Sequence, residues 1–500
     1  MSLKASLGWL LAKLTARSQA RKSADAVAYQ ETCFNALMAK GAHTAFGEDH
    51  GLCRGMSMAE FQAAVPVRDY EGLKAYVDRA VAGEHHVLWP GQPLYFCKTS
   101  GTTSGAKFIP LTTDSMPNHL RSARNALLQF IANSGRADFL DGKMIFLQGS
   151  PELTETSGGI PMGRLSGIVA HHVPGYLQAN NLPSYRANCL EPWETKIDAI
   201  VEETRNEDLR LISGIPSWVQ NYFERLLEVT GANNVLEVFP NFELFVYGGV
   251  AFEPYRERFK TLVGGEVPTV ELFPASEGFF AYQDTLESSG LRLGIDEGIF
   301  YEFIPSESYF EENPPRLTLA EVEIGVNYAL IVTTNAGLWA YDVGDTVKFT
   351  SKDPYRLVVT GRIKHFTSAF GEHVIAEEVE GAIQDAMASH GGVVSEFHVA
   401  PEVSPSEGLP YHHWFIEFAE TPVDMEGFER AVHHGVSERN PYYRDLIQGS
   451  ILQPAKVTSV SSGSFHRAMA NLGKLGGQNK PPRLANSRDF AAILLKVQKT

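Results

Sequence analysis

The sequence holds few cysteines, and this scarcity excludes a protein built on a disulfide framework. Only four of its 500 residues are cysteine, at Cys33, Cys53, Cys97 and Cys189, and no two of them form a C-x-x-C pair. Such sparse usage is typical of a reducing compartment, where disulfides do not persist. We therefore expect a cytoplasmic protein.

Basic residues are outnumbered, and long apolar runs are missing. The 43 Lys and Arg stand against 59 Asp and Glu, which gives a net charge of −16. A field of this sign does not steer a protein to phosphate backbones, so we expect no nucleic-acid partner, although a small local basic site for a nucleotide remains compatible with it. The sequence has no run of 18 apolar residues and therefore predicts no transmembrane span.

The first 22 residues contain a short apolar run between basic residues. Lys13 and Arg17 interrupt this run soon after Leu11, and no small-residue cleavage site follows. This pattern argues against a secretory signal peptide. We expect an amphipathic helix packed on the body of a monomer, without stable membrane association. Weak contact with a membrane surface is the alternative.

Apolar runs in the middle of the chain predict an α/β fold. Short runs, each expected to form a buried strand, occur at residues 144–147, 209–212, 243–247 and 269–273. Helical segments such as 193–205 and 218–230 separate them. This alternation indicates a mostly parallel sheet flanked by helices, and chemistry in such sheets collects at the carboxyl ends of the strands.

The strands lie closer together after residue 299, and the pattern changes again after Gly361. Strands at 300–304, 328–333, 346–350 and 357–359 predict an antiparallel or barrel-like section. Beyond it, helices at 376–389 and 425–439 and strands at 394–399 and 413–418 predict a small α+β unit, followed by a loop over 459–480. We expect a large N-terminal domain, 1–361, and a small C-terminal domain, 362–500.

Residues 99–107, TSGTTSGAK, form the most distinctive segment. They hold five hydroxyls and one lysine, and their glycines let a backbone bend around an anion. The segment follows an apolar run and precedes a predicted helix from Thr112, which suggests a strand–loop–helix phosphate site. It matches neither the Walker A pattern nor G-x-G-x-x-G. A flexible surface loop is the alternative.

Two predicted strands end in residues suited to a nucleotide. Gly248 and Gly249 would let a flat ring approach the backbone, unless they only form a strand-to-helix turn. After the next strand, Phe273 offers a ring face for a base, and Ser276 a donor for a phosphate oxygen. Glu277 supplies a hard oxygen ligand suited to Mg²⁺, although an ordinary exposed glutamate explains it as well.

Asp345 and Lys480 complete the set of candidates. Asp345 is placed to accept hydrogen bonds from ribose hydroxyls, whereas the alternative is a hairpin turn at Gly344 with no ligand. Lys480 lies between a glycine-rich stretch and two prolines, where its ammonium could meet a developing negative charge. A solvated surface lysine is the alternative.

In this order, the segments resemble those of adenylate-forming enzymes of the acyl-CoA synthetase and luciferase-like superfamily. More narrowly, the chain resembles the auxin-responsive Gretchen Hagen family of acyl-acid amido synthetases, in a bacterial-type form. The likeness runs from about residue 30 to about residue 485. It includes residues 44–48, 61–67, 82–84 and 159–167, together with Tyr70.

The resemblance implies a ligase that uses ATP and Mg²⁺. A small carboxylic acid becomes an acyl-adenylate with release of pyrophosphate, and an amine, often an amino acid, then takes the acyl group. The β- and γ-phosphates would be held by Thr99, Ser100, Gly101, Thr102, Thr103, Gly105 and Lys107. Gly248 and Gly249 would lie near the adenine. Phe273 takes a ring position where tyrosine is usual, so it keeps the stacking face and loses the hydroxyl.

The same resemblance assigns the remaining roles. Ser276 and Glu277 would serve phosphate and Mg²⁺. Tyr341, Asp345 and Arg362 would frame the ribose. Lys480 would offset the charge at the attacked phosphorus. Lys364 would be the hinge about which a mobile C-terminal domain rotates.

Three questions stay open from the sequence. The base that deprotonates the amine could be His172 or Glu372. An acyl-CoA ligase of the same superfamily and a nucleotide-binding scaffold without turnover remain alternatives. The acid itself is not identified, although residues 120–130 and 159–169 are expected to line its pocket.

Overall fold

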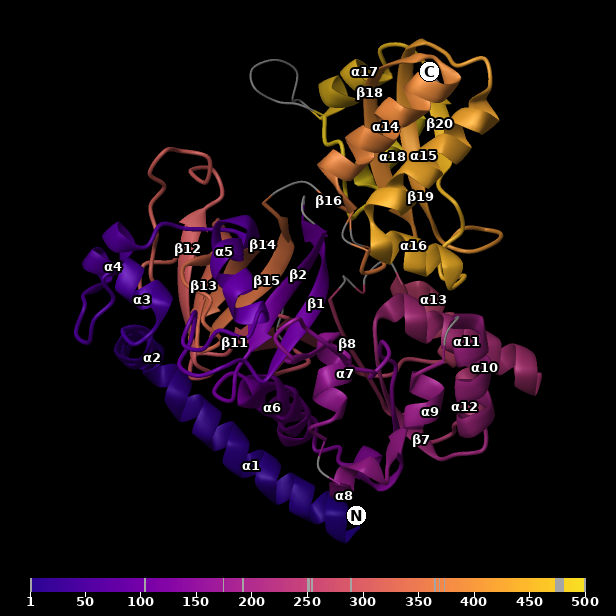
Figure 1. Cartoon of the computed structure of the whole chain (residues 1–500). Helices are drawn as coiled ribbons and strands as arrows, with labels where there is room; N and C mark the ends of the chain where they lie inside the picture. The colour runs from indigo at the N-terminus through magenta and orange to yellow at the C-terminus, as the bar shows by residue number, and fades with distance from the viewer. Residues whose placement is uncertain are drawn as a thin grey trace.

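In the computed structural model, a large body carries a smaller C-terminal part at one end (Figure 1). The structure describes residues 2–102, 105–173, 175–190, 193–249, 252, 255–287, 290–363, 366–367, 369–372, 374–472 and 481–498. The proposed phosphate contact Thr103, the hinge Lys364 and the late Lys480 lie outside these residues. None of the described helices is both long enough and apolar enough to cross a membrane.

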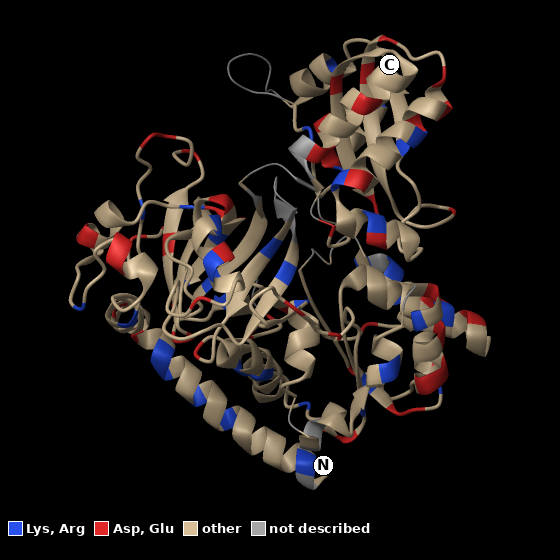
Figure 2. Ribbon diagram, in the orientation of Figure 1, with Lys and Arg blue, Asp and Glu red and all other residues tan. Residues whose placement is uncertain are grey.

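Helices cover the start of the chain. They are α1 (Leu3–Ala24), α2 (Ala26–Gly41), α3 (Ala45–Asp49), α4 (Met58–Ala64) and α5 (Tyr70–Val81). Ser57 and Glu60 form a capping box at α4, and the Asp69 side chain accepts from the Gly72 N–H at α5. The charged side chains of α1 are all Lys or Arg (Figure 2). This long helix packs on the body, as expected.

The distinctive hydroxyl-rich segment is a β-hairpin, and the expected strand–loop–helix order is wrong. Strand β1 (Tyr95–Thr102) pairs antiparallel with β2 (Gly105–Leu111), and helix α6 (Met116–Ser134) follows only after β2. Short strands β4 (Thr154–Glu155) and β5 (Pro161–Gly163) complete a four-stranded sheet in the order β2-β1-β5-β4. No helix N-terminus therefore directly follows this segment.

One mixed sheet of eleven strands forms the centre of the body. Its order is β12-β13-β14-β15-β11-β10-β9-β8-β7-β3-β6. The parallel half consists of β3 (Lys143–Phe146), β6 (Asn181–Leu182), β7 (Leu209–Ser213), β8 (Leu244–Gly248) and β9 (Thr269–Ala275). The predicted parallel α/β region is thus confirmed.

The antiparallel half continues the same sheet, so the expected barrel-like section is corrected to an open extension of it. It consists of β10 (Gly278–Tyr282), β11 (Leu291–Leu293), β12 (Ile299–Pro305), β13 (Asn327–Thr334), β14 (Tyr341–Lys352) and β15 (Tyr355–Arg362). Each of these strands pairs antiparallel with its neighbours. The antiparallel pairing itself is as predicted.

Helices bury both faces of the parallel half. The connecting elements are η1 (Asp138–Asp141), α7 (Leu165–Ala170), α8 (Gly175–Gln178), α9 (Tyr185–Asn188), α10 (Trp193–Thr204), α11 (Pro216–Thr230), α12 (Val235–Val238) and α13 (Arg256–Val263). Strand residues alternate between two cores, because successive side chains point to opposite faces. Phe245 packs in the core that includes α10 and α11, whereas its neighbours Leu244 and Val246 pack in the core under α1 and α6.

The C-terminal part is a smaller α+β unit, as predicted. It contains β16 (Phe366–Thr367), β17 (Val374–Ile375), α14 (Ala376–His390), β18 (Val393–Glu402), β19 (Tyr411–Glu420), α15 (Met425–Arg439), α16 (Pro441–Gln448), β20 (Lys456–Val460), α17 (Ser464–Asn471) and α18 (Asp489–Val497). Strands β18, β19 and β20 form one sheet. Helix α17 lies within the predicted loop over 459–480, which is therefore wrong in part. A division at residue 361 stays a prediction.

Candidate active site

The ends of β8 and β9 lie at one edge of the large sheet, because these two strands run parallel. Ser276 and Glu277 form the two-residue turn that joins β9 to β10, since Ala275 pairs with Gly278. Both residues are half-buried. The sequence prediction of a strand that runs into a polar turn is confirmed at this point.

Tyr341 and Cys97 contact this turn from two other elements. The Tyr341 hydroxyl, at the start of β14, donates to Oε1 of Glu277 at 3.4 Å. Cys97 lies in β1, and its burial raises the pKa of its thiol above the ordinary value. The nearby Glu277 carboxylate raises this pKa further, whereas a hydrogen bond with Ser276 lowers it. Cys97 is therefore a neutral thiol, and the turn is surrounded by β1, β9 and β14. No pattern in the sequence points to Cys97 as part of the site.

Asp345 and Arg362 lie opposite each other on adjacent antiparallel strands. Asp345 belongs to β14 and pairs in register with Arg362 at the end of β15. The side chain of Asp345 is 8% exposed, whereas only the backbone of Arg362 is described. Gly344 has φ +85° and its carbonyl accepts from the Ile363 N–H at 2.9 Å, within the strand. The alternative of a hairpin turn at Gly344 is therefore wrong.

Lys107 extends from β2 toward α5. It lies opposite Thr99 in the hairpin, and its Nζ is 6.0 Å from the centroid of the Tyr70 ring. The Tyr70 hydroxyl in turn accepts from the Phe108 N–H at 3.0 Å. A cation this close to an aromatic face is attracted to it. For Ser100, Gly101, Thr102 and Gly105 the structure describes the backbone alone.

Glycine is required for different reasons at Gly248 and at Gly249. A Cβ on Gly248 would lie 2.6 Å from the Leu272 carbonyl oxygen of the neighbouring strand, so close strand packing requires glycine there. Gly249 has φ +83°, and no atom of the described residues lies within 4 Å of a Cβ placed on it. Open space beside a left-handed glycine is compatible with close approach of a ligand.

Phe273 is more buried than a stacking platform needs to be. It is 7% exposed and packs edge-on against Phe280, at 5.2 Å between ring centroids. Its strand nevertheless leads directly to Ser276 and Glu277. The structure therefore places Phe273 at the site, with much of its surface used by the protein core.

The C-terminal part reaches this region through α16. The Tyr442 hydroxyl donates to the backbone carbonyl of Lys98 in β1 at 3.2 Å. Arg164 lies with its guanidinium carbon 5.0 Å from the Tyr442 ring centroid and pairs with Asp445 at 3.2 Å. Sequence reasoning missed Tyr442 and Asp445, because no local pattern connects positions so distant in the chain.

The two candidate bases differ in accessibility. Glu372 is fully buried, accepts from the Phe370 N–H at 2.8 Å and lies 2.7 Å from Nε2 of His412. His172 is half-buried, and its Nε2 lies 3.2 Å from the Tyr95 hydroxyl in β1. Burial, together with the nearby His171, lowers the pKa of His172. A neutral imidazole that can accept a proton therefore lies beside the hairpin, whereas Glu372 stabilises its own loop.

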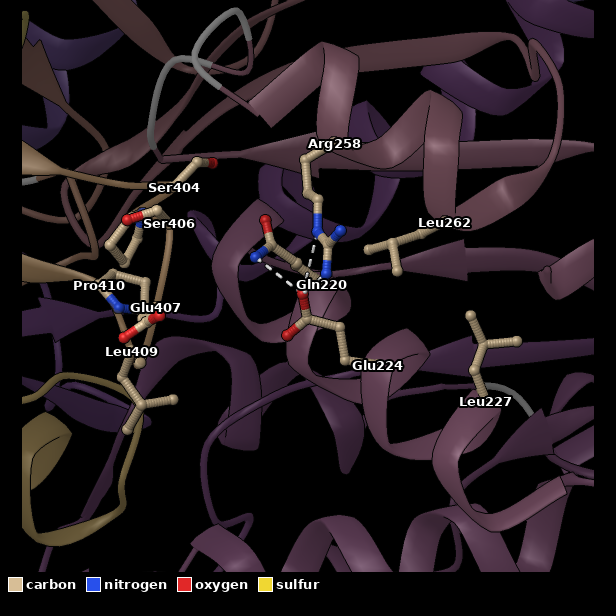
Figure 3. Close-up of a pocket in the computed structure, with 12 residues that line it drawn as sticks. Gln220, Glu224, Leu227, Arg258, Leu262, Ser404, Ser406, Glu407, Leu409 and Pro410 are labelled. Carbon is tan, nitrogen blue, oxygen red and sulfur yellow. Dashed lines mark hydrogen bonds and ion pairs between the residues drawn. The ribbon is translucent and has the colours of Figure 1, made fainter. Parts of the chain in front are cut away.

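A cavity of about 580 Å³ lies away from these residues (Figure 3). It is lined by α11, α13 and residues 404–410, and in it Glu224 accepts from Gln220 at 3.3 Å and from Arg258 at 2.8 Å. None of the predicted site residues that the structure describes is among its lining residues. We assign this cavity no part in the site.

Known proteins resemble the chain over most of its length. The N-terminal domain model of the GH3 family matches residues 16–184 and 165–269, the central domain model 293–362 and the C-terminal domain model 377–489. A probable indole-3-acetic acid-amido synthetase GH3.2 from Oryza sativa subsp. japonica is 23% identical, over 93% of this chain and 89% of its own. The jasmonoyl–L-amino acid synthetase JAR4 from Nicotiana attenuata is 22% identical, over 65% of this chain and 67% of its own.

Solved structures share the fold at lower identity. The acyl acid amido synthetase AtGH3.15, in complex with 2,4-DB, has a TM-score of 0.60 at 16% identity and covers 94% of each chain. A 2-hydroxyisobutyryl-CoA ligase in complex with 2-HIB-AMP and CoA has a TM-score of 0.56 at 15% identity, over 96% of this chain and 92% of its own. Because the three matched domain models follow one another along the chain, the protein belongs to the GH3 family of ligases, which adenylate an acyl acid and join it to an amino acid.

Proposed function

We propose that this chain adenylates a small carboxylic acid and transfers the acyl group to an amino acid beside the turn between β9 and β10, which Tyr341 at the start of β14 contacts. One observation carries the proposal: the Glu277 carboxylate accepts a hydrogen bond from the Tyr341 hydroxyl. Tyr341 lies in the same strand as Asp345, and Asp345 lies opposite Arg362. These residues come from distant segments, and they are the ones that the family resemblance assigns to metal and ribose. Relatives named for indole-3-acetic acid and jasmonoyl conjugates support a carboxylic acid as substrate, but at 22–23% identity they do not fix which acid.

The residues fit ATP and Mg²⁺. Glu277 offers a half-buried carboxylate oriented by Tyr341, and oxygen ligands of this kind suit Mg²⁺ on phosphates. The backbone at Gly249 is open for a ring to approach. When bound, Mg²⁺ would offset the charge of the phosphates. The hairpin residues Thr99 and Lys107 would hold the departing pyrophosphate.

The reaction then has two steps. A carboxylate oxygen attacks the α-phosphorus of ATP, the bond to the pyrophosphate breaks, and Lys480 offsets the added negative charge. In the second step the amine nitrogen attacks the acyl carbonyl carbon, and AMP leaves. We propose His172 as the group that accepts the proton from the amine, because it is the accessible member of the two candidates.

Pyrophosphate release over a library of carboxylic acids tests the first step. The proposal expects release with at least one acid, and a loss of about 10²–10³ in rate for Glu277→Gln, a loss comparable to that of a single transition-state donor. Glu266→Gln, an exposed glutamate paired with Lys260, is the matched control and should keep full activity. Failure with every acid would contradict the proposal.

Offering amino acids and CoA to the adenylate tests the second step. An amide with an amino acid supports the proposal. A CoA thioester formed in preference to any amide would identify an acyl-CoA ligase instead.

A further inference from the structure

Helix α1 has two apolar faces, and only one of them is covered. Ala5 and Ala12 are fully buried, and a Cβ on Gly8 would meet the Leu140 side chain, so this small-residue face packs on α6 and η1. The opposite face carries four leucines at i, i+3, i+4 and i+7, the spacing of one helical stripe. We call these residues, Leu7, Leu10, Leu11 and Leu14, the leucine face. They are 47–59% exposed, which is unusual for a cluster of this residue type.

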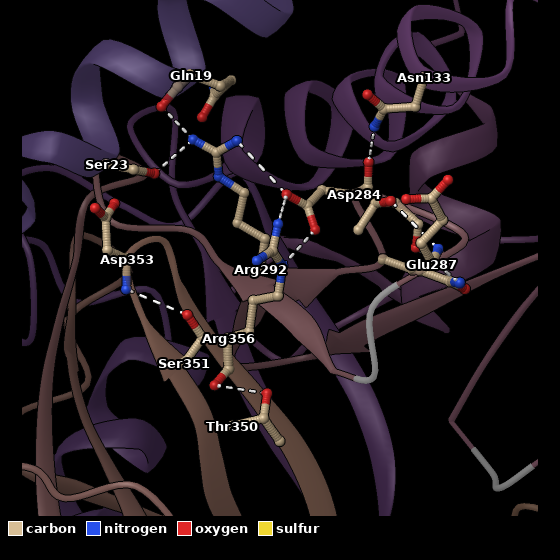
Figure 4. Close-up of polar contacts among 12 residues, drawn as sticks. Gln19, Ser23, Asn133, Asp284, Glu287, Arg292, Thr350, Ser351, Asp353 and Arg356 are labelled. Carbon is tan, nitrogen blue, oxygen red and sulfur yellow. Dashed lines mark hydrogen bonds and ion pairs between the residues drawn. The ribbon is translucent and has the colours of Figure 1, made fainter.

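The helix is fixed to the body, so the exposure of the leucine face does not come from a detached segment. Arg292 of β11 donates to the Gln19 carbonyl and to the Ser23 hydroxyl, and it lies 3.9 Å from the Asp284 carboxylate (Figure 4). Lys22 forms an ion pair with Asp296. These polar contacts hold the C-terminal half of α1 with its inner face toward the sheet.

Charge distinguishes this helix from the rest of the chain. The first 24 residues hold five Lys and Arg and none of the 59 Asp and Glu, in a protein of net charge −16. Lys4, Lys13, Arg17 and Arg21 are exposed, and the ribbon of α1 in Figure 2 has blue segments and no red ones. An apolar stripe flanked by cations is the pattern of helices that lie in the interface of an anionic membrane.

We propose that the leucine face docks on an anionic lipid surface. The leucines would enter the headgroup region, and the basic side chains would contact lipid phosphates. A second copy of the chain fits less well, because pairing two such helices would bring like charges together. Residues 3–15 precede the matched family domains, so family membership assigns the leucine face no role. Reversible docking of this kind corresponds to the weak contact with a membrane surface that the sequence leaves as an alternative.

The place of α1 is compatible with docking during turnover. In Figure 1 the helix runs along the side of the body away from the C-terminal part. A lipid surface against α1 would therefore leave the proposed site and the C-terminal part accessible. We expect vesicles to leave pyrophosphate release unchanged, which separates this proposal from the proposed function.

Vesicle co-sedimentation of the full chain tests the proposal. Wild-type protein should bind vesicles of equal parts phosphatidylcholine and phosphatidylglycerol, and binding should weaken with salt and be lost on pure phosphatidylcholine. Leu10→Ser with Leu14→Ser, and separately Arg17→Glu with Arg21→Glu, should each weaken binding at least about tenfold. Val423→Ser, at a fully exposed valine of the C-terminal part, is the matched control.

Three outcomes would overturn the proposal. The first is no binding of wild-type protein to the anionic vesicles at low salt. The second is binding that both double variants retain. The third is a dimer, detected by light scattering, that the leucine variant dissociates while vesicle binding is absent, because the leucine face would then be an interface between copies. Unchanged circular dichroism and pyrophosphate release in the variants exclude misfolding as the cause of lost binding.

Discussion

Tyr442 donates a hydrogen bond from its hydroxyl to the backbone carbonyl of Lys98, at 3.2 Å. The donor lies in α16 of the C-terminal part, and the acceptor lies in β1, next to Thr99. Arg164 supports the same contact, because it faces the Tyr442 ring and pairs with Asp445. The C-terminal part is thus attached directly to the hairpin that we propose to hold the phosphates. Any rotation of that part must break this contact.

Tyr442→Phe should therefore lower the population of the domain arrangement described here. Loss of one hydrogen bond costs about 1 kcal/mol, or roughly a fivefold change in the equilibrium between arrangements. Small-angle X-ray scattering of the ligand-free protein checks this, because the wild-type curve should fit this arrangement and the variant should require a mixture. Tyr185→Phe, at an exposed tyrosine, is the control. Identical curves for Tyr442→Phe and wild type would show that the contact does not hold the two parts together.

Asp345→Ala should weaken the binding of ATP itself. Asp345 is 8% exposed and lies in register with Arg362, and we propose that its carboxylate accepts hydrogen bonds from the ribose. Loss of hydrogen bonds to a charged group costs about 1.5–3 kcal/mol, which predicts a dissociation constant roughly 10- to 100-fold larger. Isothermal titration calorimetry with ATP measures this dissociation constant. Asp353→Ala, at an exposed aspartate just beyond the far end of the same strand, should bind normally. Unchanged affinity in Asp345→Ala would refute the ribose role.

Local patterns predicted most helices and strand ends but not the hairpin. The capping box of Ser57 and Glu60 and the polar turn at Ser276 and Glu277 are set by neighbours in sequence, so they could be found there. Strand β1 instead runs through Gly101, a residue type that is depleted in strands, and pairing with β2 continues it to Thr102. Such pairing is a tertiary effect that overrides local preference.

The same limit applies to contacts between distant segments. Cys97 looks like an isolated cysteine in the sequence, and only the fold brings it to Ser276 and Glu277. Tyr442 likewise reaches Lys98 across more than half of the chain. The sequence could predict that the ends of β8 and β9 lie at one edge of the sheet, because parallel strands place their ends together. It could not predict which ordinary core or surface residues complete that site.

Lys480→Ala should lower adenylation while ATP binding largely survives. The role comes from the family resemblance, since Lys480 lies outside the described residues. A positioned cation that acts in the transition state is worth about 3–4 kcal/mol, or roughly 10²–10³ in rate. Exchange between ATP and labelled pyrophosphate measures the step, and titration with ATP measures binding. Lys474→Ala, in the same segment, is the control. Equal losses of rate and binding would show that Lys480 is misassigned.

Alanine at Gly248 and at Gly249 should have different effects. Gly248→Ala places a Cβ 2.6 Å from the Leu272 carbonyl oxygen, and such overpacking lowers the free energy of unfolding by about 1–3 kcal/mol. Gly249→Ala meets no atom of the part of the chain that the structure describes, but it adopts φ +83°, which costs about 1 kcal/mol. We expect only Gly249→Ala to weaken ATP binding as well, because its Cβ would enter the space proposed for the adenine.

Gly231→Ala is the control for backbone strain alone. Gly231 ends α11 with φ +70° and has nothing within 4 Å of a Cβ. Urea unfolding should therefore show the same loss of stability for Gly231→Ala as for Gly249→Ala. Gly231→Ala should bind ATP with normal affinity. If Gly249→Ala also binds ATP normally, this glycine serves the turn and not the nucleotide.

Buried His119 should make the protein less stable as the pH falls. The side chain, in α6, is 4% exposed, and within the part of the chain that the structure describes its Nδ1 has no hydrogen-bond partner. Burial lowers the pKa of His119 from 6.5 to about 4. The folded protein therefore keeps this imidazole neutral at pH values where the unfolded chain binds a proton. Stability present above pH 6.5 is lost as the pH falls toward 4, by up to roughly 3 kcal/mol.

Urea unfolding of wild type and His119→Gln between pH 7.5 and 4.5 checks this prediction. The variant should be less stable at pH 7.5, because the buried site is packed for an imidazole, but the difference should shrink as the pH falls. In His119→Gln the slope of the free energy of unfolding against pH should decrease without vanishing, because burial also lowers the pKa values of His398 and His413 to about 4. His434→Gln, at an exposed histidine, should leave the slope unchanged. A constant difference between His119→Gln and wild type at every pH would mean that His119 is protonated equally in the folded and unfolded chains.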